Sequence, residues 1–157
     1  MKLFMAKNIY EQLSARYSTE LVFQQRKNFS FSERGTRYHC ELSRAWYCAG
    51  FQVDGNIITE GVRCDKLAVI ERENNQWTEI FVELKGSDIM HAVEQLEATI
   101  QCSVFQHKSV NRRLARVVGH SFPSYKSDPR VEKAKIRFLQ RHHCELRYLK
   151  SDQKDVV

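Results

Sequence analysis

Two short runs of sequence decide the fold: Cys64-Asp65-Lys66-Leu67-Ala68-Val69-Ile70 and Ile80-Phe81-Val82-Glu83-Leu84-Lys85-Gly86. Each run is short, apolar and rich in β-branched or aromatic residues, which predicts two neighbouring β-strands. Because side chains alternate between the two faces of a strand, Glu83 and Lys85 should project from the same face, about 7 Å apart. Asp65 should lie on the adjacent strand. Charged groups in a half-buried sheet are costly, so this trio predicts a functional site.

The rest of the chain predicts strands and helices on either side of these runs. Upstream we expect a helix over residues 8–18, a loop or irregular hairpin over 28–35, and strands over 36–42 and 45–53. An Asp54-Gly55 turn should close the last of these, and residues 57–59 could extend the hairpin. The two central strands should span residues 65–71 and 77–85, joined by a polar turn.

Downstream of the central strands, the pattern alternates between helices and strands. A helix capped by Ser87 or Asp88 should carry an apolar stripe from Ile89 to Ile100, with Val104 extending it. We then expect a strand over 114–122, a helix opened by Asp128-Pro129, and a strand over 144–149. This order predicts an α/β fold in which helices flank a mixed central β-sheet.

The composition is that of a folded globular protein. The 157 residues suit one domain over residues 1–157, and a fold of this size buries roughly 70% of its unfolded surface. Two prolines and six glycines leave little room for a flexible linker between domains. The formal net charge of +6 is compatible with a phosphate-rich partner, although many basic proteins bind no nucleic acid.

The cysteines and the N-terminus indicate the cellular compartment. The five cysteines are odd in number and never spaced as C-x-x-C, which argues against a secreted disulfide scaffold and a zinc knuckle. The first residues lack the continuous apolar stretch of a signal peptide, and no window is long enough to span a bilayer. We therefore expect a soluble, cytoplasmic protein with reduced thiols and no membrane partner.

The central trio has the chemistry that phosphodiester hydrolysis requires. Mg²⁺ binds carboxylate oxygens, carbonyls and water, so Asp65, Glu83 and the carbonyl of Leu84 are the predicted metal ligands. Bound metal lowers the pKa of its water, and Lys85 would orient that nucleophile or offset charge on the phosphorus. The alternative is that Glu83 and Lys85 form a solvent-facing pair on a strand, because E-x-K triplets are common.

These residues also resemble a known family. Asp65, followed by Glu83-Leu84-Lys85 at the end of the next strand and then by a helix, is similar to the PD-(D/E)xK nuclease superfamily, whose core has the same element order. The likeness to small stand-alone bacterial and phage members covers residues 51–101, through Arg63-Cys64-Asp65, Phe81 to Asp88 and Ala92-Val93-Glu94-Gln95. One position departs from the pattern, since Cys64 replaces the proline of the superfamily's name.

The resemblance implies a restriction-endonuclease-like core and a Mg²⁺-dependent nuclease, with Mn²⁺ as an alternative cation. Its substrate would be nucleic acid, DNA in preference to RNA. Gln95 becomes the fourth catalytic candidate beside Asp65, Glu83 and Lys85, because similar nucleases use a glutamine there to steady the site or substrate. The alternative for Gln95 is an ordinary residue on the flank of its helix. The three central groups should converge in one open basic cleft.

Basic side chains near the C-terminal half are the predicted contacts to nucleic acid: Arg112, Arg113, Arg116 and Lys126. A second basic group over residues 130–137 is explained equally well as a solvated helix face. Three aromatic residues, Trp46, Tyr47 and Phe51, are predicted to be core or strand residues rather than a base-stacking platform.

For the remaining candidates we favour structural roles over functional ones. Asp54 is first a turn residue and second an extra ligand, and Asp88 is best explained as a group at the positive end of a helix. Surface or helix-terminal positions are favoured for Glu11, Glu41, Glu60 and His142-His143-Cys144. A homodimer would let a small site cut both strands of a duplex, but no sequence feature demonstrates one.

The sequence thus leaves two main functions open. One is a metal-dependent nuclease. The other is a catalytically inactive module of the same fold that binds nucleic acid or a partner protein. A third option is an enzyme that acts on another phosphoester.

Overall fold

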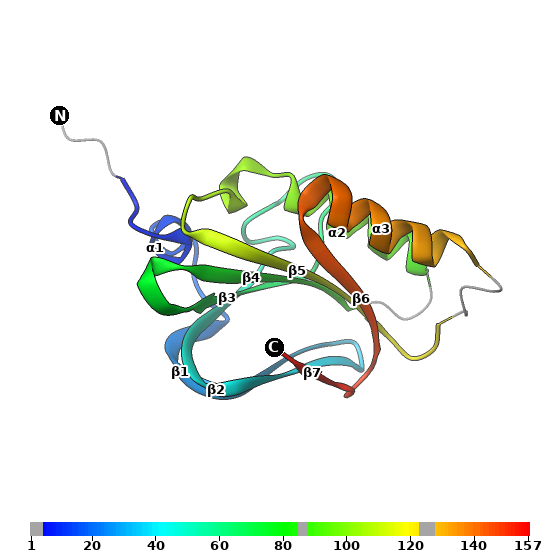
Figure 1. The fold of residues 1–157 in the computed structure, drawn as a ribbon, viewed down its shortest axis with the longest axis horizontal. Helices are drawn as coiled ribbons and strands as arrows, with labels where there is room; N and C mark the ends of the chain where they lie inside the picture. The colour runs from blue at the N-terminus through cyan, green and yellow to red at the C-terminus, as the bar shows by residue number, and fades with distance from the viewer. Residues whose placement is uncertain (1–4, 85–87, 123–127) are drawn as a thin grey trace.

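The computed structural model describes residues 5–84, 88–122 and 128–157. These residues form an α/β fold with a mixed, open sheet of seven strands and three α-helices (Figure 1). The strands are β1 Leu21–Glu33, β2 Thr36–Gln52, β3 Lys66–Glu71, β4 Trp77–Leu84, β5 Val110–Gly119, β6 Cys144–Lys150 and β7 Lys154–Val156. The α-helices are α1 Ile9–Ser14, α2 Ile89–Ile100 and α3 Arg130–His142. Along the sheet the strand order is β1-β2-β3-β4-β5-β6, and β7 pairs with β2.

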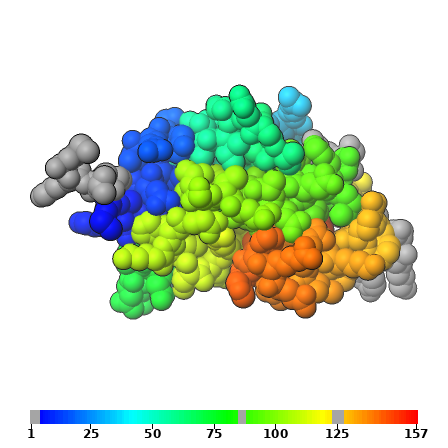
Figure 2. Space-filling view, turned by 90° about the horizontal axis from the view of Figure 1, so that it is seen from above, coloured from blue at the N-terminus to red at the C-terminus, as the bar shows by residue number. Residues whose placement is uncertain are grey.

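The sheet changes character at β4. Strands β1 to β4 are antiparallel neighbours, whereas β4, β5 and β6 run parallel, with α2 and α3 as the crossover helices between them. Both helices cover the same face of the sheet (Figures 1 and 2). Leu96 of α2 and Phe138 of α3 are buried there in one core cluster with Phe81 and Ala115 of the sheet.

The opposite face is covered by the β1–β2 hairpin, which curls back over the sheet (Figure 1). Phe31 and Tyr38, from the far half of the hairpin, belong to a second core cluster with Ile80 of β4 and Leu114 of β5. Gly50 makes the curl possible, because a Cβ at this position would lie 2.8 Å from the ring of Phe31. The far half of the hairpin can therefore lie directly over the near half.

A buried polar cluster fastens the curled hairpin. β7 pairs in parallel with residues 39–41 of β2. The Asp155 carboxylate of β7 accepts hydrogen bonds from the Tyr38 hydroxyl at 2.6 Å and from Arg116 Nε of β5 at 2.7 Å. These side chains are buried, so the C-terminal strand connects the hairpin to the parallel part of the sheet.

Two expectations about the secondary structure are confirmed. The element order from β3 to β6 agrees with the prediction, and Asp88 caps α2 by accepting a hydrogen bond from the backbone N–H of His91. All five cysteines lie within the described residues and are free thiols. Among the described residues, no helix is both long enough and apolar enough to cross a membrane.

Other expectations are wrong. The strands predicted over 36–42 and 45–53 are one continuous strand, and residues 28–33, predicted as loop or irregular hairpin, are the far half of the long strand β1. Residues 57–59 do not extend the hairpin, and Val104 lies in a separate 3₁₀ turn rather than in α2. The first helix ends at Ser14, and β7 was not expected. Polar residues hid both β1 and β7, and β7 is in addition stabilised by pairing with residues 39–41, which are distant in the sequence.

Candidate functional site

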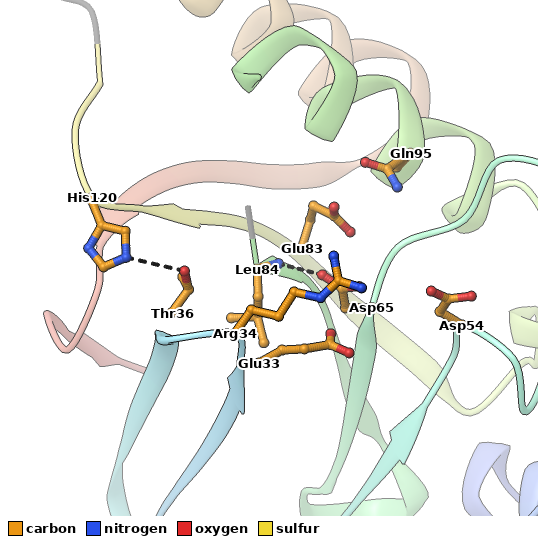
Figure 3. Close-up of a pocket in the computed structure, with 9 residues that line it drawn as sticks. All are labelled: Glu33, Arg34, Thr36, Asp54, Asp65, Glu83, Leu84, Gln95 and His120. Atoms are coloured by element: carbon orange, nitrogen blue, oxygen red, sulfur yellow. Dashed lines mark hydrogen bonds between the residues drawn. The ribbon is translucent and has the colours of Figure 1, made fainter. Parts of the chain in front are cut away.

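A pocket of about 420 Å³ lies at the edge of the sheet where β4 and β5 end (Figure 3). In α/β sheets this edge, beyond the carboxyl ends of the strands, is where ligands commonly bind. The pocket is lined by Glu33, Arg34, Thr36, Asp54, Asp65, Glu83, Leu84, Gln95 and His120. Four of the predicted site residues are in that set, from three separate elements: Asp65, Glu83, Leu84 and Gln95.

Asp65 is held firmly beside the end of β4. Its backbone N–H donates to the carbonyl of Val82 at 3.2 Å, and its own carbonyl accepts from the N–H of Val53. The Asp65 carboxylate accepts a hydrogen bond from the N–H of Leu84 at 2.8 Å. Asp65 therefore lies just before β3 rather than within it, its backbone is held by Val82, and its side chain is oriented by the N–H of Leu84.

Glu83 is buried at the end of β4, and its side chain faces the helix-covered side of the sheet. Asp65 and Glu83 thus enter the same pocket from neighbouring strands. Lys85, the predicted catalytic lysine, lies outside the described residues, as does Lys126.

Glu33 adds a carboxyl group that the sequence did not predict. It is the last residue of β1, and the curl of the hairpin brings it to the pocket. Partial burial raises the pKa of Glu33, and the nearby charge of Asp65 together with a hydrogen bond between the two carboxyl groups raises it further. Two carboxyl groups in contact favour a shared proton or a cation between them.

Arg34 follows Glu33 at the hairpin turn and extends into the same pocket (Figure 3). Its backbone is left-handed, with φ at 49°, and Gly35 follows with φ at 81°. Such turns favour Asn, Asp or Gly at both central positions, so an arginine here is unusual. No carboxylate among the described residues forms an ion pair with Arg34. A left-handed arginine at a hairpin tip is a local signal, but sequence alone does not indicate what it faces.

Gln95 connects α2 to the segment that precedes Asp65. Its side-chain Nε2 donates to the carbonyl of Arg63 at 3.0 Å, and one helical turn later the Thr99 hydroxyl accepts from the N–H of Cys64 at 2.8 Å. The Oε1 atom of Gln95 is buried and has no hydrogen-bond partner among the described residues. Gln95 therefore positions the Asp65 segment and leaves an acceptor atom beside the pocket.

The remaining lining residues define the walls. Asp54, weighed as an extra ligand, pairs with Arg63 at 2.6 Å, which balances its charge. His120 follows β5 and lies 3.4 Å from the hydroxyl of Thr36 on the hairpin. Neither Thr36 nor His120 was predicted, because their meeting depends on the curl.

The expectation of a basic cleft is wrong. Four carboxyl side chains line the pocket, whereas the basic side chains among its described lining residues are Arg34 and His120. Carboxylate, amide and carbonyl oxygens are the ligands of hard divalent cations, so this lining fits Mg²⁺. No three described His, Cys, Asp or Glu side chains are already arranged around one point as a metal cage. Three features of the pocket therefore suit Mg²⁺: the oxygen donors of its lining, the Glu33–Asp65 contact and the Oε1 atom of Gln95.

Two of the arginines predicted to contact nucleic acid have structural partners instead. Arg116 is 1% exposed and forms ion pairs with Asp155 and Glu145, so it is a structural residue that no phosphate can reach. Arg113 pairs with the buried Glu79 at 3.1 Å and donates to the carbonyl of Phe105. Arg112, in contrast, is exposed at the start of β5.

The other candidates have structural surroundings. Glu41 pairs with Lys154 at 3.4 Å, and Glu60 is exposed. His142 lies 3.0 Å from Glu97 of α2, which fastens the end of α3 to its neighbour. Cys144 is buried in β6, and Glu11 is in the first turn of α1 rather than in the pocket.

Comparison of the chain with models of known protein families, with curated proteins and with solved structures gives no match.

Proposed function

We propose that this protein is a metal-dependent nuclease that hydrolyses phosphodiester bonds of nucleic acid, DNA in preference to RNA. The observation that supports this proposal best is the shared pocket of Asp65, Glu83 and Glu33 at the end of β4. Several carboxyl groups that line one pocket favour a divalent cation, and the motif residues are those that resemble PD-(D/E)xK nucleases. A restriction-endonuclease-like core belongs to the same proposal.

The side chains of the pocket divide into ligands and positioning groups. Asp65, Glu83 and the carbonyl of Leu84 would hold Mg²⁺ or Mn²⁺. When bound, the cation would supply an activated water and offset the charge of the phosphate. The N–H of Leu84 keeps the Asp65 carboxylate aimed at the pocket, and Gln95 holds the segment that carries Asp65. Arg34 would contact the scissile phosphate, since a guanidinium matches phosphate oxygens in shape and charge. Lys85 keeps its predicted role as the catalytic lysine.

The decisive test combines substitution with metal dependence. We expect the wild-type protein to cut single- or double-stranded nucleic acid with Mg²⁺ or Mn²⁺, and chelation by EDTA to abolish cutting. Glu83→Gln and Asp65→Asn should each lower the rate by at least about 100-fold, because each removes a ligand charge. Glu60→Gln removes an exposed carboxylate outside the pocket and serves as the matched control.

Two further measurements make this test conclusive. Circular dichroism and thermal melting should show that the variants remain folded. Calorimetric titration with Mn²⁺ should show binding to the wild type and to Glu60→Gln, but weakened binding to Asp65→Asn. A wild type that binds nucleic acid, yet neither binds Mn²⁺ nor cuts any substrate, would instead establish the inactive binding module.

A homodimer is part of the proposal for duplex substrates, because one small site cuts one strand at a time. Sedimentation velocity with and without a duplex tests it directly. Assembly into a two-protomer complex on the duplex is the expected result, and a strictly monomeric complex that still makes double-strand breaks would contradict it.

A further inference from the structure

We infer that four arginines around Trp46 bind the sugar–phosphate backbone of the nucleic acid that the pocket is proposed to cut. These residues, here called the arginine row, are Arg26, Arg44, Arg72 and Arg112. They lie at the end of β3 opposite to the carboxylate pocket. The inference rests on the proposed function for its ligand, but it concerns a separate surface.

The row crosses the sheet from β1 to β5. Arg26 on β1 pairs directly with Trp46 on β2. Arg72 follows β3, and its Nε donates to the Thr78 hydroxyl of β4 at 3.2 Å. Thr78 in turn pairs with Arg112 of β5. Neighbouring strands are about 4.8 Å apart, so the four steps from β1 to β5 cover about 19 Å.

Trp46 organises two of the guanidinium groups. The Arg44 guanidinium lies 3.9 Å from the centroid of the Trp46 ring, and that of Arg72 lies 5.0 Å from it. Such cation–π contacts stabilise positive charge at a fixed position. Burial lowers the pKa of Arg72, and the charges of Arg112 and Arg44 lower it further. Arginine nevertheless remains charged at neutral pH, so the repulsion persists until an anion relieves it.

The positive charge of the row is poorly balanced within the protein. Arg44 pairs with Glu73 at 3.0 Å, but both side chains are more than half exposed, and such pairs contribute little. Arg26, Arg72 and Arg112 form no ion pair with a described carboxylate. Even with Glu71 and Glu73 counted, the four arginines leave a local excess of positive charge.

A hollow of about 520 Å³ opens beside the row and is lined by Arg44, Trp46, Tyr47 and Arg72 among others, including Glu71. Arg44 and Arg72 bring two guanidinium groups to the lining of this hollow. Tyr47 is 46% exposed at its rim. Guanidinium groups at an open hollow suit phosphate oxygens, because half or more of the hydrogen bonds in protein–DNA complexes go to the phosphates and sugars.

The spacing of the two surfaces indicates the length of ligand required. Seven residues separate Asp65 from Arg72 along β3, which corresponds to about 23 Å. At 3.4 Å per base pair, a duplex needs about seven steps to reach from one to the other. A ligand that contacts both surfaces must therefore be at least this long, and a small phosphodiester is too short to do so.

Binding of a labelled duplex of about 20 base pairs, and of the corresponding single strand, tests the inference by fluorescence anisotropy in EDTA. The double variant Arg44→Ala/Arg112→Ala removes two exposed arginines of the row. The control Lys133→Ala/Arg141→Ala removes two exposed basic groups of α3, on the other face of the sheet. We expect the first variant to weaken binding about 10-fold and to reduce the slope of log K against log salt by about 2. The control should bind within about 2-fold of the wild type.

The outcomes separate this inference from the proposed function. Three results would overturn the inference about the arginine row. Arg44→Ala/Arg112→Ala could bind as tightly as the wild type, the α3 control could lose as much affinity, or the wild type could bind neither the duplex nor the single strand. If the wild type cuts nucleic acid but the row variant binds normally, the nuclease proposal stands alone. If the row variant loses binding and neither it nor the wild type cuts nucleic acid, the arginine row is supported and the proposal of hydrolysis is refuted. Hydrolysis of bis-p-nitrophenyl phosphate with Mn²⁺ should be the same in wild type and row variant.

Discussion

Arg34 combines a left-handed backbone with a side chain that reaches into a pocket of carboxyl groups. Replacement by glycine removes the steric cost of that backbone together with the guanidinium. We expect Arg34→Gly to leave the free energy of unfolding unchanged or raise it by up to about 1 kcal/mol, and to lower the proposed nuclease activity at least about 10-fold. Urea unfolding and cleavage assays on the same preparation measure both.

Arg37 provides the control for this prediction. It lies on the same hairpin, is largely exposed, and pairs with Asp152 at 3.5 Å away from the pocket. Arg37→Ala should leave cleavage within about 2-fold, as surface pairs contribute little. Full activity of Arg34→Gly would exclude a role of Arg34 in contacting the phosphate.

At this scale the sequence predicted Asp65 and Glu83 for a clear reason. Asp65 directly precedes β3 and Glu83 lies near the end of β4, and the apolar pattern of these two strands fixes the face to which each side chain points. It could not separate Arg112 from Arg113 and Arg116, since all three share one strand. Their partners, Glu79 and Asp155, lie far away along the chain, and only the fold decides which arginine they neutralise.

The β1–β2 hairpin is the element on which the completeness of the pocket depends. A methyl group at Gly50 would lie 2.8 Å from the ring of Phe31 and force the curled half of the hairpin outward. We expect Gly50→Ala to destabilise the protein by about 1–3 kcal/mol, the usual cost of overpacking. Because the hairpin tip carries Glu33 and Arg34, activity should fall in the fraction that remains folded.

A second substitution tests the cause of that loss. Phe31→Leu shortens the side chain that meets the new methyl group, so Gly50→Ala/Phe31→Leu should be less destabilised than the sum of the single changes. Strict additivity in urea unfolding would show that the Phe31 contact is not responsible. No local pattern predicts this curl, which is why Thr36, His120 and the hairpin residues of the pocket were missed while α2, α3 and the parallel strands were found.

For the whole molecule, the cluster of Asp155, Arg116 and Tyr38 joins the C-terminal strand to both halves of the sheet. Asp155→Asn leaves the buried guanidinium of Arg116 without its closest anion. We expect it to lower the free energy of unfolding by about 3–5 kcal/mol, and Tyr38→Phe by about 1–2 kcal/mol. Asp152→Asn, which affects an exposed pair with Arg37, should change it by less than about 0.5 kcal/mol. Equal effects at the two aspartates would contradict a structural role for the cluster.

The pairing of β7 with residues 39–41 has a consequence for protein synthesis. Glu33 and Arg34 are translated early, yet the hairpin that presents them is fastened by residues 154–156, to which the backbone N–H of Val157 adds a hydrogen bond with the Glu41 carbonyl. A nascent chain in which residues 154–156 have not yet emerged from the ribosome lacks the strand that fastens the far half of the hairpin. The order of synthesis would thus delay the completion of the pocket until residues 154–156 can pair with the hairpin.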